Sequence, residues 1–114
     1  KGLGIRFLRH VERTKILLHL IDLSGGEGRE PLRDFHIINK ELLRFSPELA
    51  SKPQIVAGNK IDIPQAREKF EKVKDEFNNI HVEILPISAV TGEGIEVLIT
   101  CIADKLFSGD TTTQ

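Results

Sequence analysis

The sequence has very little of several features that would define a class of protein. It contains one cysteine, Cys101, which excludes an internal disulfide framework and is typical of a reducing compartment. No apolar run approaches the roughly 18 residues of a membrane-spanning helix, and the first residues do not resemble a secretory signal. With 16 basic and 17 acidic residues, the net charge of -1 favours neither nucleic acid nor an anionic membrane as a partner. These absences predict a cytoplasmic location and no membrane association.

The length and the apolar content of the chain predict one small domain. Its 114 residues are 39% hydrophobic, which is enough for a single packed core, and no repeat or low-complexity linker divides them. We expect the domain to cover residues 1–109 and residues 110–114 to form a disordered tail.

Three apolar runs predict buried strands, at residues 15–23, 54–59 and 81–88. The first run is nearly all apolar and rich in β-branched side chains, which is typical of a strand covered on both faces in a parallel sheet. One helix is expected after each strand. Because proline suits the first turn of a helix, helices are predicted over residues 31–45 and from Pro64 onward.

The ends of these helices are predicted from proline and glycine. Pro47 is expected to stop the first helix from continuing. The third helix is predicted from about Gly94 to Phe107, with Gly109 as its stop signal. The apolar face of the second helix is predicted to consist of Ala66, Phe70, Val73 and Phe77.

Strand and helix therefore alternate three times, which predicts an α/β fold. Right-handed crossovers would assemble the three strands into a parallel sheet with helices on its faces. In such sheets ligands bind beyond the carboxyl ends of the strands. That edge is where we expect a functional site.

Polar residues follow the second and third strands at their carboxyl ends. The second strand ends in Asn59-Lys60-Ile61-Asp62, and the third ends in Ser88-Ala89. Taken alone, an Asn-Lys-x-Asp string is compatible with a polar turn that caps a helix. Its occurrence at one strand end, with Ser-Ala at the end of the next strand, favours a shared binding site.

The side chain of Asp62 suits the recognition of a guanine base. Guanine presents an N1 hydrogen and an exocyclic amino group side by side, and a carboxylate accepts from both as a charge-assisted fork. Adenine lacks both donors on that edge, and sites of this kind reject the wrong partner by factors on the order of 10⁴. Asp62 is therefore predicted to set the base specificity.

The other four residues are expected to support Asp62. Asn59 can tie the loop to neighbouring backbone, and the stem of Lys60 can lie across the purine with its ammonium group in solvent. The backbone N–H of Ala89 is expected to donate to guanine O6. The hydroxyl of Ser88 is expected to brace the Asp62 loop.

The two strand-end strings resemble known motifs. Asn59-Lys60-Ile61-Asp62 is similar to the fourth motif, and Ser88-Ala89 to the fifth, of Ras-like GTPases related to translation factors. Residues 2–13 resemble the stretch after switch II in the Obg family of ribosome-associated GTPases, and residues 31–53 contain further similar strings. The resemblance covers nearly the whole chain. It implies the C-terminal half of a P-loop GTPase (Ras-like) domain.

The resemblance also implies a function for the intact protein. It would bind GTP and GDP with Mg²⁺, hydrolyse GTP, and act in large ribosomal subunit assembly through that subunit or its rRNA. The phosphate-binding string G-x-x-x-x-G-K-[ST] does not occur in the chain, and the switch elements that hold magnesium are not identified in it. We therefore expect no metal ligands and no catalytic residue here, and an inactive chain when it is alone.

Two segments could be mistaken for sites. The loop Gly25-Gly26-Glu27-Gly28 lacks a following Lys and Ser/Thr pair, and Glu27 would repel phosphate, so we interpret it as a surface turn. Residues 3–11 predict an amphipathic helix. Its basic face is either a solvated surface or, given the resemblance, a contact for ribosomal RNA. This face consists of Arg6, Arg9, His10 and Arg13.

The histidines and the cysteine have structural interpretations. His19 is interpreted as a core or interface residue, and no two histidines show the spacing of zinc ligands. Cys101 is interpreted as a small buried apolar side chain. In Ras-like sheets the strand of the phosphate loop pairs beside the strand at residues 15–23, which predicts an exposed edge in this chain.

Two other readings remain open at this point. The chain could be a non-catalytic interaction module, whether an isolated fragment or a degenerate GTPase without significant nucleotide binding. A flavodoxin-like metabolic domain has the same alternation of strands and helices, but it requires both strand-end strings to be coincidental. A phosphate loop upstream of Lys1 would favour the GTPase over the interaction module.

Overall fold

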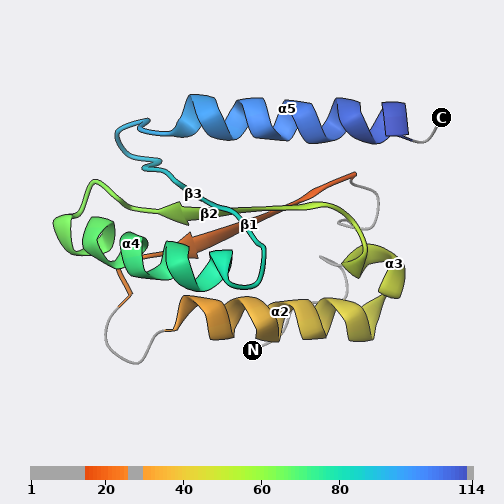
Figure 1. Cartoon of the computed structure of the whole chain (residues 1–114), viewed down its shortest axis with the longest axis horizontal. Helices are drawn as coiled ribbons and strands as arrows, with labels where there is room; N and C mark the ends of the chain where they lie inside the picture. The colour runs from red at the N-terminus through yellow and green to blue at the C-terminus, as the bar shows by residue number, and fades with distance from the viewer. Residues whose placement is uncertain (1–14, 26–29, 113–114) are drawn as a thin grey trace.

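The computed structural model describes residues 15–25 and 30–112, the last five of these by their backbone alone. Figure 1 shows three layers: a sheet, helix α5 on one face, and helices α2 and α4 on the other. The strands are β1 (Leu17–Asp22), β2 (Gln54–Asn59) and β3 (Ile84–Pro86). The helices are α2 (Pro31–Phe45), α3 (Pro47–Ala50), α4 (Pro64–Asn78) and α5 (Ile95–Thr112).

The sheet has the order β1-β2-β3 with every neighbour parallel, which confirms the predicted α/β class. The register pairs Asp22 of β1 with Asn59 of β2, and Gly58 of β2 with Pro86 of β3. Because all three strands run in the same direction, their carboxyl ends lie along one edge of the sheet. This edge carries the residues singled out from the sequence.

Most of the core lies between the sheet and helices α2 and α4. Phe77 of α4 is fully buried and packs edge-on against Phe35 of α2, with ring centroids 5.2 Å apart. Aromatic pairs in this arrangement contribute beyond the area that they bury. The predicted apolar face of α4 is confirmed, since all four of its residues are buried. On the other face, Leu98 of α5 packs on the sheet.

The prediction that the first strand is covered on both faces is wrong for the described part of the chain. Leu18 and Leu20 are 42% and 55% exposed, whereas Ile21 on the opposite face is buried. The described residues put α5 over β2 and β3, where it packs on Ile55 and Leu85, and no helix covers the Leu18 side of β1. Strand β1 is also an edge of the described sheet.

Helix α2 ends at Phe45 as expected, and Pro47 begins the short helix α3, which was not predicted. Ser46 adopts an extended backbone between the two helices, and its hydroxyl accepts from Leu49 N at 3.1 Å, which makes it the N-cap of α3. Two other element ends differ from the expectation. The third strand is shorter than residues 81–88, although Ile87 N still donates to the β2 residue Gly58 at 2.9 Å. Helix α5 continues past Gly109 to Thr112, so Gly109 does not end the helix. Residues 110–112 are therefore helical, and the rest of the predicted tail lies outside the described residues.

His19 and Cys101 occupy intermediate environments. The ring of His19 lies 5.3 Å from that of Phe35, and burial lowers its pKa while the charge of Asp34 opposes the shift. Cys101 was expected to be buried, but it is only half-buried against the α5 side of the sheet. The predicted N-terminal helix with its basic face lies outside the described residues. No described helix is long and apolar enough to span a membrane.

The exposed edge and face of β1 lead to a prediction for the isolated 114-residue chain. In the described part of the chain β1 is an edge strand with Leu18 and Leu20 exposed, and this favours association with a second copy, because edge strands with apolar faces template further pairing. Sedimentation velocity is expected to detect dimers or larger species whose share rises with concentration. A single stable monomer at every concentration would contradict this expectation. The double variant Leu18→Lys, Leu20→Lys places two charges on the exposed face of β1, and it is expected to be monomeric.

Candidate functional site

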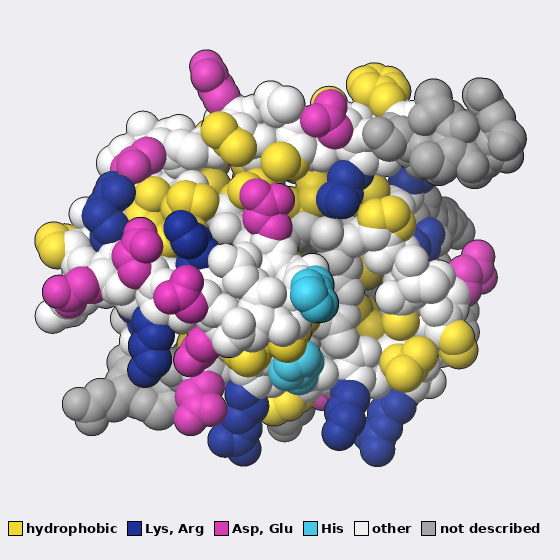
Figure 2. Space-filling view, viewed as in Figure 1, with side chains coloured by type: hydrophobic (Ala, Val, Ile, Leu, Met, Phe, Trp, Pro, Cys, Tyr) yellow, Lys and Arg dark blue, Asp and Glu magenta, His cyan; other side chains and the backbone are white. Residues whose placement is uncertain are grey.

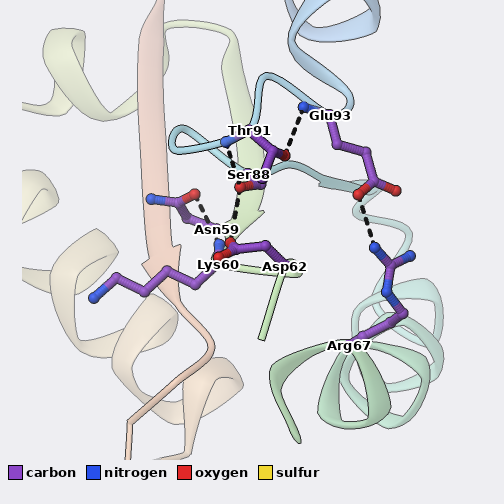
Figure 3. Close-up of polar contacts among 7 residues, drawn as sticks. All are labelled: Asn59, Lys60, Asp62, Arg67, Ser88, Thr91 and Glu93. Carbon is purple, nitrogen blue, oxygen red and sulfur yellow. Dashed lines mark hydrogen bonds and ion pairs between the residues drawn. The ribbon is translucent and has the colours of Figure 1, made fainter. Parts of the chain in front are cut away.

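The predicted site residues come together at the carboxyl edge of the sheet. Asn59 ends β2, Lys60 and Asp62 follow it, and Ser88 and Ala89 follow β3. Figure 3 shows the two loops side by side, with the side chains of Asn59 and Asp62 directed toward the Ser88 loop. The structure thus brings together all five residues that the sequence analysis selected.

Asn59 joins the two loops through one oxygen atom. Its Oδ1 accepts from the backbone N of Lys60 at 2.7 Å and from the backbone N of Ala89 at 3.0 Å. The amide nitrogen of Asn59 remains as a donor beside the loops. The expected tie to neighbouring backbone is therefore present, and it uses the same Ala89 N–H that was expected to serve a ligand.

Ser88 holds the carboxylate of Asp62 in place. Its hydroxyl donates to Asp62 Oδ1 at 2.8 Å and accepts from Thr91 N at 3.1 Å. Ser88 is fully buried, so this hydroxyl is bonded on both sides inside the protein, whereas Asp62 is exposed. The expected bracing by Ser88 is observed. An exposed carboxylate with one oxygen fixed is pre-oriented to accept from a ligand with its other oxygen.

The loop that carries Ala89 is closed on itself. Ser88 N donates to Glu93 O at 2.9 Å, and Gly92 N donates to Ser88 O at 2.8 Å. Gly92 and Gly94 have φ of 88° and 76°, values that glycine adopts without a steric penalty. The guanidinium of Arg67 on α4 pairs with Glu93 at 2.7 Å, so the loop is also tied to the helix that follows Asp62.

Lys60 and Asp22 form a contact that sequence reasoning missed. Lys60 Nζ lies 3.1 Å from Asp22 Oδ2, at the end of β1. The ammonium group was expected to lie in solvent, and it instead forms an ion pair. Asp22 Oδ1 also accepts from Ser24 N at 2.8 Å and from Ser24 Oγ at 2.6 Å. The bonds from Ser24, followed by Lys60, lower the pKa of Asp22 to about 2.

Two signals in the sequence could have identified Asp22. It is the first charged residue after the apolar run of β1, at the same strand end as the other site residues. With Gly25 it also has Asp-x-x-Gly spacing, which is the spacing of the magnesium-binding switch motif that we expected to be absent from the chain. In the structure its carboxylate is engaged by Ser24 and Lys60, and the described residues contain no cluster of three potential metal ligands.

A separate hollow lies between α2 and α4. It has a volume of about 850 Å³ and includes none of the five site residues. Figure 2 shows basic and acidic side chains mixed over the described surface that faces the viewer, with several basic groups along the lower edge of the molecule in this view. The basic residues that line the hollow are Arg33, His36, Lys40, Lys69 and Lys72. It does not contribute to the strand-end site.

Comparison with solved structures defines the class of the fold. A crystal structure of Era in complex with MgGDPNP and a segment of 16S ribosomal RNA superposes with a TM-score of 0.63 and 32% sequence identity. The match covers 83% of this chain and 30% of that one. The chain therefore has the fold of part of a P-loop GTPase.

Sequence comparison finds relatives of this chain among the Obg GTPases. GTPase Obg of Caldicellulosiruptor saccharolyticus is 58% identical over 98 residues, covering 86% of this chain and 23% of that protein. GTPase Obg of Myxococcus xanthus is 50% identical over 111 residues, covering 96% and 23%. No protein-family model matches the chain. The chain is a homologue of the Obg GTPases, and the similarity is consistent with the C-terminal part of their G domain. It spans about a quarter of the length of these relatives.

Proposed function

We propose that the carboxyl edge of the sheet binds the guanine base of GTP and GDP. The observation that carries this proposal is the carboxylate of Asp62, exposed to solvent and held by the buried hydroxyl of Ser88 at 2.8 Å. A charged acceptor fixed in this way is suited to two adjacent donors of a flat ligand. The N1–H and the exocyclic amino group of guanine form such a pair.

The energetics favour guanine over adenine at this position. Each hydrogen bond to a charged group contributes roughly 1.5–3 kcal/mol. Adenine has no adjacent donors of this kind on the corresponding edge, so it would leave the Asp62 carboxylate without partners. Because such a carboxylate loses its water and gains nothing, the discrimination is expected to be on the order of 10⁴.

The remaining residues complete the proposed base site. We propose that the Ala89 N–H donates to guanine O6, which requires this N–H to be shared with, or released by, Asn59 Oδ1, to which it donates at 3.0 Å. The amide nitrogen of Asn59 is a donor for the imidazole side of the purine. The aliphatic stem of Lys60 is half-exposed and offers an apolar surface for the base plane.

For the intact protein we propose GTP hydrolysis by a complete GTPase domain, of which residues 1–109 form part. The chain lacks the phosphate-binding string G-x-x-x-x-G-K-[ST], so we expect the phosphates and their Mg²⁺ to be held by other residues of the intact protein. The family resemblance supports a role in large ribosomal subunit assembly. The Era structure contains 16S ribosomal RNA, which belongs to the small subunit, so it supports ribosomal RNA as a class of partner and not the large subunit. We also propose a cytoplasmic location, for which the single cysteine, Cys101, is the support. Nucleotide-dependent cosedimentation with isolated large subunits tests the partner.

Competition binding tests the base site directly. In the intact protein, GDP is expected to displace a fluorescent guanine nucleotide at a concentration that is on the order of 10⁴-fold lower than the concentration of ADP needed. The two ligands carry the same phosphates, so their ratio reports the base alone. Equal displacement by ADP and GDP would overturn the proposed site.

The isolated chain provides a second test. It is expected to bind GTP weakly or undetectably in calorimetric titration, because the phosphate and magnesium contacts are proposed to come from other residues. Submicromolar affinity would contradict that division. If the intact protein also shows no preference for guanine nucleotides, the result would favour the alternative, a non-catalytic interaction module.

A further inference from the structure

Asp22 lies at a third strand end, beside the two that carry the proposed base site. The register places it opposite Asn59, and Leu23 N donates to Asn59 O at 3.2 Å. The backbone pairing of β1 and β2 therefore fixes the position of Asp22 relative to the Asn59 loop. None of the five proposed base-binding residues comes from β1.

The carboxylate of Asp22 is oriented before it meets Lys60. Ser24 donates to Asp22 Oδ1 from both its backbone N and its hydroxyl, which leaves Oδ2 for the lysine. Two bonds to one oxygen restrict the rotation of the carboxylate about its side chain. An acceptor that is already oriented loses less freedom when it pairs than a free surface side chain does.

The backbone of Lys60 is constrained as well. Its φ of 80° lies in the left-handed region, which is uncommon for a residue with a side chain. Asn59 Oδ1 stabilises this turn by accepting from Lys60 N at 2.7 Å. The side chain of Lys60 is thereby anchored at its base by Asn59 and at its tip by Asp22.

We propose that Asp22 is a positioning residue of the guanine site, which acts by holding the Lys60 side chain in place before the base binds. The proposal rests on the function proposed above for the same edge. Lysine side chains lose considerable rotamer freedom when a ligand orders them. If Asp22 orders the stem of Lys60 in the free protein, less freedom is lost on binding.

The variants are chosen to separate the ion pair from the local turn. Asp22→Asn keeps an oxygen that accepts from Ser24 but removes the charge that attracts Lys60. Lys60→Met keeps an apolar stem but removes the ammonium group. Asp75→Asn, an exposed position on α4, makes the same change in net charge away from the site and serves as the control.

The experiment is a double-mutant cycle on GDP affinity in the intact protein at low salt. Asp22→Asn is expected to weaken binding by about two- to fivefold, the range that half-exposed ion pairs support. The same substitution in the Lys60→Met background is expected to have almost no further effect. The Asp22→Asn effect should also shrink at high salt, because exposed charges are screened.

Two outcomes of the cycle would decide against the proposal. An effect of Asp22→Asn that is equally large in the Lys60→Met background would show that Asp22 acts independently of Lys60. Wild-type affinity for Asp22→Asn at low salt would also overturn it. If Lys60→Met abolishes measurable binding, the salt dependence of the Asp22→Asn effect alone decides. These failures leave the GDP preference over ADP intact, so they are distinct from failure of the proposed function.

Discussion

Replacing Asp62 with asparagine is expected to move the base preference of the intact protein from guanine to xanthine. Xanthine carries a carbonyl where guanine carries its exocyclic amino group. The amide of asparagine donates to that carbonyl, whereas the carboxylate of Asp62 would face it as a second acceptor. The ratio of XDP to GDP affinity should rise by a factor on the order of 10⁴.

The local geometry favours a clean result for this substitution. Asparagine retains an oxygen that accepts from Ser88 Oγ, which now bonds Asp62 at 2.8 Å, so the loop is expected to keep its shape. Because Asp62 is exposed, no packing is lost. Competition between XDP and GDP measures the ratio, and Asp75→Asn is the control for the change in charge. Unchanged guanine preference would refute the role given to Asp62.

The sequence predicted the elements whose signals are local. The bounds of β2 and α2 agree with the expected ones, because Pro31 suits the first helical turn and Ser46 adopts an extended backbone at the other end. Helix α4 shows its expected apolar face. The clustering of Asn59 and Ser88 followed from one general rule, that parallel strands meet at their carboxyl ends.

What could not be predicted depends on contacts between distant segments. A continuous apolar run gives no indication that Leu18 and Leu20 are exposed, because alternation is the only local sign of a half-covered strand. Helix α5 passes Gly109 because one glycine costs only about 1 kcal/mol in a helix. The pairing of Asp22 with Lys60 arises from side-chain directions set by the sheet.

The other large effect is expected at Gly94, where the loop of the base site enters α5. A methyl group built on Gly94 lies 2.1 Å from the carbonyl oxygen of Pro86, a distance that no real side chain tolerates. The obstacle is backbone at the end of β3, so either this strand or the start of α5 must move. Gly94→Ala is therefore expected to destabilise this domain by about 3 kcal/mol or more.

Gly92→Ala separates this clash from the backbone strain. Gly92 also has positive φ, at 88°, but nothing lies within 4 Å of its added methyl group. It should cost only the left-handed conformation, about 1–2 kcal/mol. Hydrogen exchange of the β2 and β3 amides in the intact protein measures both losses locally. Equal losses for the two variants would show that the Pro86 contact does not matter.

The Gly94 substitution also connects stability to the base site. Pro86 is two residues before Ser88, and the Ser88 hydroxyl must stay within hydrogen-bond distance of Asp62 to hold its carboxylate. Displacement of the β3 end by the added methyl group releases that bond and moves Ala89. Gly94→Ala is thus expected to weaken GDP binding at temperatures where the domain remains folded, whereas Gly92→Ala should weaken it less, because its loop closes without moving Pro86.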